Sequence, residues 1–219
     1  HYLTGLTGDE VPVGIADFFK QTLSSGPFAK KGKVDIYETP FDNLHVVTAT
    51  AELADLQPKL EAKHKIYKLS AALQELTHSY DEIFIDTPPA FNFYTLSALI
   101  AAERCLIPFD CDAFSRRALY TLMENVQETC NDHNKALRIE GIIINQFQPR
   151  ASLPVKLVNE LRAEGLPVLD PALSSSVIMR ESHQLCLPLI HHAPKHKLTQ
   201  EFVALFERLT MLPAEVPAP

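Results

Sequence analysis

No stretch of the 219 residues stays apolar for the roughly 18 residues that a membrane-spanning helix needs. The four cysteines lack C-x-x-C spacing, so the sequence predicts reduced thiols in a cytoplasmic protein rather than a disulfide framework. Basic residues are the minority, because 20 Lys and Arg against 27 Asp and Glu give a net charge of -7. This balance excludes a surface that binds nucleic acid everywhere, but it leaves room for a local basic patch.

A phosphate-binding loop of the form G-x-x-x-x-G-K-[ST] is also missing. Such a loop binds phosphate through backbone N–H groups and a lysine. Lys30–Lys33 places a glycine among lysines, but the spacing is different and no strand precedes it, so a solvated loop is expected. The sequence begins at His1 without an initiator methionine, so the natural start and any targeting signal are expected to lie upstream.

What the sequence does contain is enough apolar residues, 46% of the total, for one sizeable α/β domain. Short unbroken apolar runs, typical of strands buried in a parallel sheet, alternate with helical patterns. We therefore expect a mostly parallel, twisted sheet flanked by helices on both faces, forming a single domain over residues 1–212. The proline-rich tail at 213–219 is predicted to be disordered.

The apolar periodicity and the turn residues predict where the individual elements lie. Predicted strands cover Val34–Glu38, Leu44–Thr48, Ile83–Ile85, Cys105–Phe109, Ile139–Ile144 and Val168–Leu169. Predicted helices cover Gly14–Leu23, Glu52–Leu76, Tyr94–Ala102, Ser115–Cys130, Pro154–Ala163 and Leu198–Leu212. Pro58 is expected to restart or kink the long second helix, and Ser115 suits the N-cap of its helix.

The stretch Tyr80–Pro89 carries the first candidate site. The run Ile83–Ile85 stops at Asp86, and the two prolines that follow forbid further ladder hydrogen bonds. A carboxylate at the end of a buried parallel strand faces the crevice where open α/β sheets bind ligands. There it can hold magnesium, directly or through a water, beside nucleotide phosphates. The alternative is that Asp86 ends the strand and caps the following helix.

Arg116 and Arg117 lie in the first turn of a predicted helix, where the helix dipole disfavours positive charge. This placement indicates another purpose for the two side chains. Either they form salt bridges with Asp110 or Asp112, or they contact a ligand or DNA.

Three motifs in order resemble the Walker B region of the ParA/MinD family, whose members partition plasmids and chromosomes or place the division site. They are the D-x-P-P of Asp86–Pro89 after a Tyr-Asp lead, the T-x-x-A-L of Thr95–Leu99, and the strand ending in Ile107-Pro108. The resemblance continues over essentially the whole chain. It implies a P-loop ATPase fold with ATP and Mg²⁺ as cofactors.

The resemblance also implies roles for single residues. Asp86 is expected on the magnesium side of the nucleotide, and Pro88 and Asn145 are expected to bind the nucleotide itself. In the family an Asn or Asp at the position of Asn145 recognises adenine, and an amide suits this task because it donates and accepts in one plane. The alternative is that Asn145 only turns the chain at the strand end. No catalytic residue is assigned within this sequence.

The family further implies an ATP-dependent homodimer that binds DNA without sequence preference, in the cytoplasm and on the nucleoid, and no membrane partner. A ParB-like protein is expected to stimulate hydrolysis and release. The Pro194–Lys197 run matches the family's P-K-S-K, but Ser174, Ser175 and Ile178 stand where the family has Pro, Arg and Arg. The candidates for DNA contact are Arg116, Arg117, Arg180, Lys195 and Lys197.

Two other functions remain open at this point. A scaffold ATPase of the same fold would position a protein complex without touching DNA, and the altered loop at Ser174, Ser175 and Ile178 favours it. A metabolic P-loop enzyme such as dethiobiotin synthetase shares the topology, although D-x-P-P and T-x-x-A-L fit it less well.

The sequence resembles the family without its first phosphate-binding unit, and this predicts the activity of the isolated chain. The 219-residue chain should show no ATP hydrolysis above background, because it lacks the phosphate-binding loop and its lysine. Phosphate release from the purified chain measures this directly. A turnover that Asp86→Ala abolishes would contradict the prediction.

Overall fold

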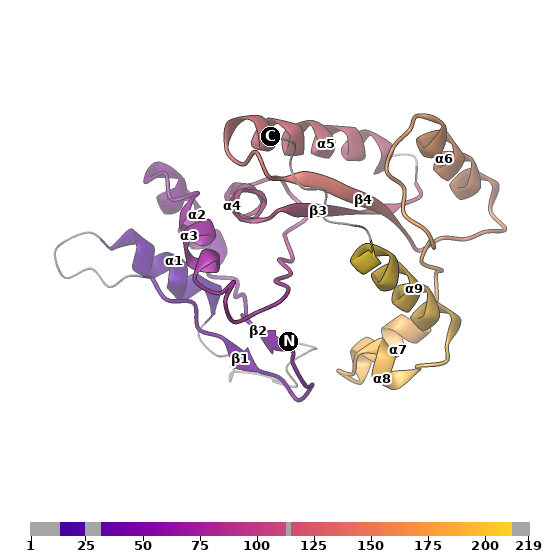
Figure 1. Ribbon diagram of the computed structural model, residues 1–219, viewed down its shortest axis with the longest axis horizontal. Coiled ribbons are helices and arrows are strands. Elements are labelled where there is room, and N and C mark those ends of the chain that lie inside the picture. Colours follow the sequence, from indigo (N-terminus) through magenta and orange to yellow (C-terminus); the bar gives the residue numbers. More distant parts are fainter. Residues whose placement is uncertain (1–13, 25–31, 113–114, 212–219) are drawn as a thin grey trace. The chain divides into compact units, whose positions relative to one another are not determined.

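A computed structural model describes residues 14–24, 32–112 and 115–211 of the chain. The chain divides into two compact units, residues 1–102 and 103–219, whose helices and strands are labelled in Figure 1. The single domain over residues 1–212 therefore stays a prediction. The tail at 213–219 lies outside the described residues, as does the lysine pair at 30–31.

Helices and a short antiparallel ribbon make up the described part of the first unit. Its elements are α1 (Ile15–Leu23), β1 (Tyr37–Glu38), β2 (His45–Val46), α2 (Leu53–Ala62), α3 (Lys68–Gln74) and α4 (Phe93–Ala101). Aromatic rings pack together in the core, where Phe19 of α1 lies edge-on against Phe93 and Tyr94 with ring centroids 5.8 Å and 5.4 Å apart. The predicted first helix is confirmed, and the two predicted strands form, each only two residues long.

The predicted long helix over Glu52–Leu76 is interrupted, but not at Pro58 as expected. Pro58 lies inside α2, and because it is exposed, the carbonyl that its missing N–H leaves free can be hydrated. The break follows α2, where His64 takes a left-handed φ of 50°. Its N–H donates to Glu61, and the N–H of Lys65 donates to Leu60 at 3.1 Å. This paired hydrogen bonding ends a helix firmly.

The predicted strand at Ile83–Ile85 is wrong. These residues carry no strand pairing, and Ile83 and Phe84 are 39% and 74% exposed. Of the three, Ile85 packs against the core of the first unit. A buried strand requires hydrogen-bonded neighbours, and among the described residues no strand pairs with this segment. Asp86 therefore follows a segment without regular secondary structure rather than a central strand.

Helix α4 shows what the T-x-x-A-L motif does. Thr95, Ala98 and Leu99 are all buried, at 6%, 4% and 7% exposure. The Thr95 hydroxyl donates to the carbonyl of Ala90 at 2.8 Å and so fixes the loop before the helix. Asn92 is the N-cap, since its Oδ1 accepts from the N–H groups of Tyr94 and Thr95. The alternative that Asp86 caps this helix is therefore wrong.

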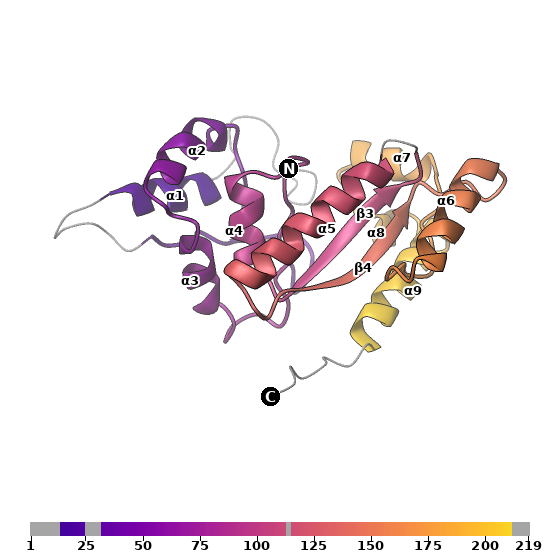
Figure 2. The same cartoon turned by 90° about the horizontal axis from the view of Figure 1, so that it is seen from above.

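The described part of the second unit alternates strands and helices. Its elements are β3 (Arg104–Asp110), α5 (Ser115–Asp132), β4 (Arg138–Asn145), α6 (Ser152–Ala163), α7 (Ile178–Gln184), α8 (Leu189–His192) and α9 (Lys197–Met211). β3 and β4 are parallel, and in Figure 2 the connecting helix α5 runs along them. The predicted strands at Cys105–Phe109 and Ile139–Ile144 and the predicted helices here are confirmed to within a few residues, whereas Val168–Leu169 forms only an isolated bridge.

Helices cover both faces of the β3–β4 pair, as Figure 1 shows with α5 on one side and α9 on the other. Alternate strand residues face α5 and α6, where Leu119, Val158 and Leu161 are buried against them. The strand residues on this face are Ile107, Phe109, Ile142 and Ile144. On the opposite face Leu106 and Ile143 pack against a cluster that includes Leu205 of α9. The expected α/β fold with a parallel sheet between helices is confirmed.

A third extended segment, residues 167–174, lies parallel beside β4 and takes the place of the predicted last strand. Val168 bridges Ile142, and the N–H of Leu169 donates to the Ile142 carbonyl at 2.9 Å. The approach is close at Gly141, where an added Cβ would lie 2.4 Å from the Leu169 Cγ. A larger residue at this position would require the Leu169 side chain to shift.

The Asn92 cap gives a test of α4. Asn92→Ala should lower the free energy of unfolding by about 1 kcal/mol, because two first-turn N–H groups lose their acceptor. Urea unfolding followed by circular dichroism measures the change. Asn159→Ala, at an exposed position inside α6, is the matched control and should be neutral, since alanine favours the helix interior. Equal destabilisation by the two variants would contradict the capping role.

Candidate functional site

Polar side chains meet where β3 and β4 end. Asp110 is the last residue of β3, Asn145 is the last residue of β4, and the two are partners in the strand register. The Asn145 Nδ2 donates to Asp110 Oδ1 at 3.0 Å, and the Gln146 Nε2 donates to Asp110 Oδ2 at 3.3 Å. Each oxygen of the Asp110 carboxylate thus accepts a hydrogen bond from a side-chain amide. This is the carboxyl edge of a parallel pair, where open α/β sheets bind ligands.

The chain turns sharply after Asn145 and is then tied down. Gln146 has a left-handed φ of 50°, a conformation that disfavours residues with a Cβ and persists where neighbours hold it. The next residue, Phe147, donates its N–H to the Leu173 carbonyl at 2.8 Å and bridges Ser174. The amides of Asn145 and Gln146 are therefore presented by a constrained turn. The predicted alternative, that Asn145 stands at a chain turn, also describes its position.

Cys111 follows Asp110 and is a neutral thiol at ordinary pH. Burial raises its pKa to about 11, and the negative charges of Asp110 and Asp112 add to this shift. A thiol needs its thiolate form to act as a nucleophile or to bind a metal. Cys111 is thus a packing residue. Asp112 caps α5 by accepting the Ser115 N–H at 2.7 Å, in place of the predicted cap by Ser115 itself.

Asp86 and Pro88 lie in the first unit, and both are exposed. Their segment is fastened at both ends. The Tyr80 hydroxyl and the His45 Nδ1 are hydrogen-bonded at 2.7 Å, and Thr95 holds the carbonyl of Ala90. Among the described residues no hydrogen bond or ion pair engages the Asp86 carboxylate, so its oxygens are available to a ligand.

Arg116 is paired, but with other acids than Asp110 and Asp112. Its guanidinium donates to Glu160 at 2.7 Å and also to Glu164, both on α6, and it lies 5.8 Å from the centroid of the Tyr120 ring. The hydrogen bond with Tyr120 raises the pKa of Arg116, and the two glutamates act in the same direction. The cluster joins α5 to α6. These contacts pair the positive charge of Arg116, which the sequence proposed as a candidate for DNA contact.

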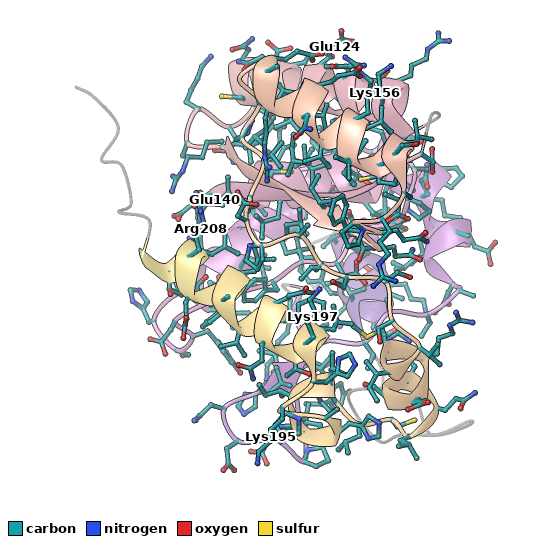
Figure 3. The ribbon with its side chains drawn as sticks, turned by 90° about the vertical axis from the view of Figure 1, so that its right-hand side faces the viewer. Glu124, Glu140, Lys156, Lys195, Lys197 and Arg208 are labelled. Atoms are coloured by element: carbon teal, nitrogen blue, oxygen red, sulfur yellow. The ribbon has the colours of Figure 1, made fainter. Side chains whose placement is uncertain are left out.

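The other four basic candidates are exposed. Figure 3 shows Lys195 and Lys197 at the N-terminal end of α9. Lys197 is paired with Glu201 at 3.4 Å, whereas among the described residues no ion pair engages Arg117, Arg180 or Lys195.

Glu201 also fixes the loop around Ser174, Ser175 and Ile178, where the sequence differs from the pattern that it otherwise resembles. Its carboxylate accepts the N–H and the hydroxyl of Ser174, each at 2.7 Å. The side chain of Glu201 is only 12% exposed. Ser174 therefore joins the loop to α9, a role that the sequence pattern does not reveal.

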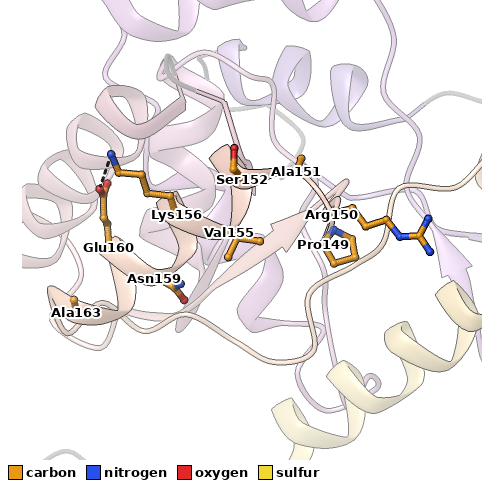
Figure 4. A pocket seen from close by; sticks show the side chains of 9 residues that line it. All are labelled: Pro149, Arg150, Ala151, Ser152, Val155, Lys156, Asn159, Glu160 and Ala163. Carbon is orange, nitrogen blue, oxygen red and sulfur yellow. Dashed lines mark ion pairs between the residues drawn. The ribbon is translucent and has the colours of Figure 1, made fainter.

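An open hollow of about 670 Å³ lies along α6 and was not anticipated from the sequence. Figure 4 shows its lining, with Lys156 turned toward Glu160 and Arg150 extending from the loop before the helix. The ion pair measures 3.8 Å. The remaining lining is mostly small or apolar and brings no buried polar group into the hollow. The edge at Asp110 and Asn145 is the better candidate site.

The described residues contain no group of three or more His, Cys, Asp or Glu side chains that could hold a metal ion. In the same part of the chain no helix has both the length and the apolar character needed to cross a membrane.

Comparison with protein families supports the resemblance noted in the sequence. The model of the AAA domain family matches residues 20–139, which is more than half of the chain. The chromosome partitioning protein ParA of Myxococcus xanthus is 30% identical over 176 residues, covering 80% of this chain and 62% of that protein. The chain spans between 62% and 64% of the length of the ParA proteins of M. xanthus and Caulobacter vibrioides.

Solved structures agree on the fold. Cobyrinic acid a,c-diamide synthase from Mycobacterium smegmatis, solved with an ATP analogue and magnesium, superposes with a TM-score of 0.76 at 20% identity over 95% of this chain and 76% of that one. The septum site-determining protein MinD from Pyrococcus horikoshii, solved with Mg-ADP, gives a TM-score of 0.67 at 20% identity over 93% of this chain and 76% of that one. At this identity the two structures establish the fold alone.

The environment of Cys111 gives a test of the strand edge. Its pKa of about 11, against an ordinary 9.0, should make alkylation by iodoacetamide at pH 8 about 100-fold slower than in the urea-unfolded chain. Peptide mass spectrometry across pH 7–10 measures the rate. Asp110→Asn should speed the reaction by removing one neighbouring charge. Equal rates in the folded and unfolded chains would contradict the burial and the nearby carboxylates.

Proposed function

Since the chain belongs to the ParA/MinD family of P-loop ATPases, we propose that its protein is a ParA-like partitioning ATPase of chromosomes or plasmids. The similarity to a partitioning ParA over 80% of the chain supports this function. The geometric observation that supports it most is the constrained amide of Asn145 at the carboxyl edge of the parallel strands. That is where an α/β fold binds nucleotides.

Asn145 and Pro88 serve the nucleotide in this proposal. Asn145 recognises adenine, because its amide offers an oxygen acceptor and a nitrogen donor in one plane. One hydrogen of Nδ2 goes to Asp110, which leaves the second hydrogen and Oδ1 for the base. The exposed Pro88 contacts the nucleotide from the segment after Asp86.

Asp86 fits a magnesium ion. A carboxylate oxygen is the ligand that Mg²⁺ prefers, held directly or through a water. The Asp86 carboxylate is exposed and, among the described residues, takes part in no hydrogen bond or ion pair. A bound magnesium supplies charge neutralisation at the triphosphate. Asp86 holds and orients it, while Thr95 and Tyr80 fix the ends of its segment.

The full protein hydrolyses ATP, and this chain alone does not. Phosphoryl transfer rests on backbone N–H groups and a lysine at the phosphates, and no loop of that kind occurs in the 219 residues. We infer that these groups come from another part of the protein.

ATP bridges two copies into a homodimer, and the dimer binds DNA through a few basic side chains without reading sequence. Arg117, Arg180 and Lys195 are the best suited candidates, because they are exposed and unpaired among the described residues. Arg116 and Lys197 contribute less, since carboxylates already hold their charge. A ParB-like protein stimulates hydrolysis and releases the DNA, in the cytoplasm and on the nucleoid.

A second function, a scaffold ATPase that positions a protein complex without DNA, is favoured by the loop at 174–178. Both the N–H and the hydroxyl of Ser174 donate hydrogen bonds to Glu201. Ser175 and Ile178 bring no charge to the loop. Such a loop offers no positive charge to the phosphates of DNA. DNA binding by the full-length protein distinguishes the two functions.

A gel-shift titration of the full-length protein with ATP, repeated across salt concentrations, tests DNA binding. Arg117→Ala should weaken binding, and the slope of log K against log salt should fall by about 1, because one phosphate contact is lost. Lys135→Ala, an exposed lysine beyond the other end of α5, is the matched control and should leave the slope unchanged. No retardation of DNA at low salt would defeat the proposal and favour the scaffold.

A further inference from the structure

We propose that Asp110 is a positioning residue that fixes the orientation of the Asn145 amide and thereby makes the site prefer adenine over guanine nucleotides. This inference rests on the proposed function, in which Asn145 meets the base. It adds Asp110, from the neighbouring strand β3, to the residues of the proposed nucleotide site.

The strand register sets the geometry. Asp110 and Asn145 are directly paired across parallel β3 and β4, so backbone hydrogen bonds keep the two side chains adjacent. The contact between Asn145 Nδ2 and Asp110 Oδ1 is 3.0 Å long. A charged acceptor makes such a hydrogen bond stronger than one between neutral groups.

The chemistry of the two groups then decides which way the amide points. An ionised carboxylate only accepts hydrogen bonds, whereas an amide accepts at one end and donates at the other. The nitrogen of Asn145 must therefore face Asp110, and its oxygen must face away. Without the carboxylate the amide can rotate by half a turn and exchange the two ends.

The orientation matters because adenine and guanine present opposite patterns on their Watson–Crick edges. Adenine carries an amino donor beside the N1 acceptor, whereas guanine carries the O6 acceptor beside an N1–H donor. An amide with a fixed oxygen accepts from the adenine amino group. Against guanine the same oxygen would meet O6 and leave both groups unpaired, which strongly disfavours binding. A freely rotating amide would accommodate either base.

Gln146 keeps Asp110 itself in place. Its Nε2 donates to the second carboxylate oxygen at 3.3 Å, and its backbone takes the left-handed φ of 50° that brings it there. The carbonyl of Asp110 also accepts the Asp112 N–H at 2.8 Å. With both oxygens and the backbone engaged, the carboxylate is a fixed reference for the amide.

The test uses the full-length protein and compares its dissociation constants for ATP and GTP by calorimetry. Asp110→Ala should reduce the preference for ATP by about tenfold, chiefly by improving GTP binding, since the loss of one orienting hydrogen bond to a charge is of that size. Asp110→Asn keeps the shape and one acceptor oxygen, so it should retain part of the preference. Asp132→Ala, an exposed acid at the far end of α5, should change nothing.

The outcomes separate this inference from the proposed function. Circular dichroism establishes whether each variant is folded. If Asp110→Ala does not fold, the Asp110→Asn variant decides the result. An unchanged ratio of ATP to GTP affinity in the folded variants would overturn the positioning role while ATP binding stands. Failure of the wild-type protein to bind ATP, or full ATP affinity in Asn145→Ala, would overturn the nucleotide site itself.

Discussion

Parallel pairing of β3 with β4 is the constraint on which the second unit depends. Because the strands are parallel, their carboxyl ends lie at one edge, and the register makes Asp110 and Asn145 neighbours. Because both faces are apolar, one is covered by α5 and α6 and the other by α9. A slip of one residue would turn every buried isoleucine to the opposite face. The polar edge is thus held by the same packing that forms the core.

Sequence patterns predicted the elements of the second unit well because each has strong local signals and finds its partner nearby. They failed at Ile83–Ile85, where an apolar run indicates a buried strand only if another strand supplies hydrogen bonds. Phe84, 74% exposed, has no such neighbour among the described residues. The predicted long helix over Glu52–Leu76 was wrong for another reason. Its break depends on a left-handed turn at His64, and the sequence has no glycine there to indicate such a turn.

The candidate site was predictable in part for the same physical reason. Asn145 can be found because it ends an evident strand, whereas for Asp110, at the end of another evident strand, the sequence indicates only a salt bridge with an arginine. The contact between Asp110 and Asn145 depends on the register between two strands, and the two residues are 35 positions apart in the chain. A pattern along one strand does not contain that register. The pairing of Arg116 with Glu160 and Glu164 likewise requires knowing that α6 packs beside α5.

The contact between Ser174 and Glu201 sets an order of events during synthesis. The loop that follows residue 170 receives its anchor from a carboxylate 27 residues further along the chain. While the chain emerges from the ribosome, β3 and β4 can pair first, since both precede this loop, and the turn at Phe147 is held once Leu173 follows. The contact between the loop and α9 forms only after α9 has been made. A nascent chain that stalls before residue 201 would therefore carry paired strands beside a loop that still lacks its contact with Glu201.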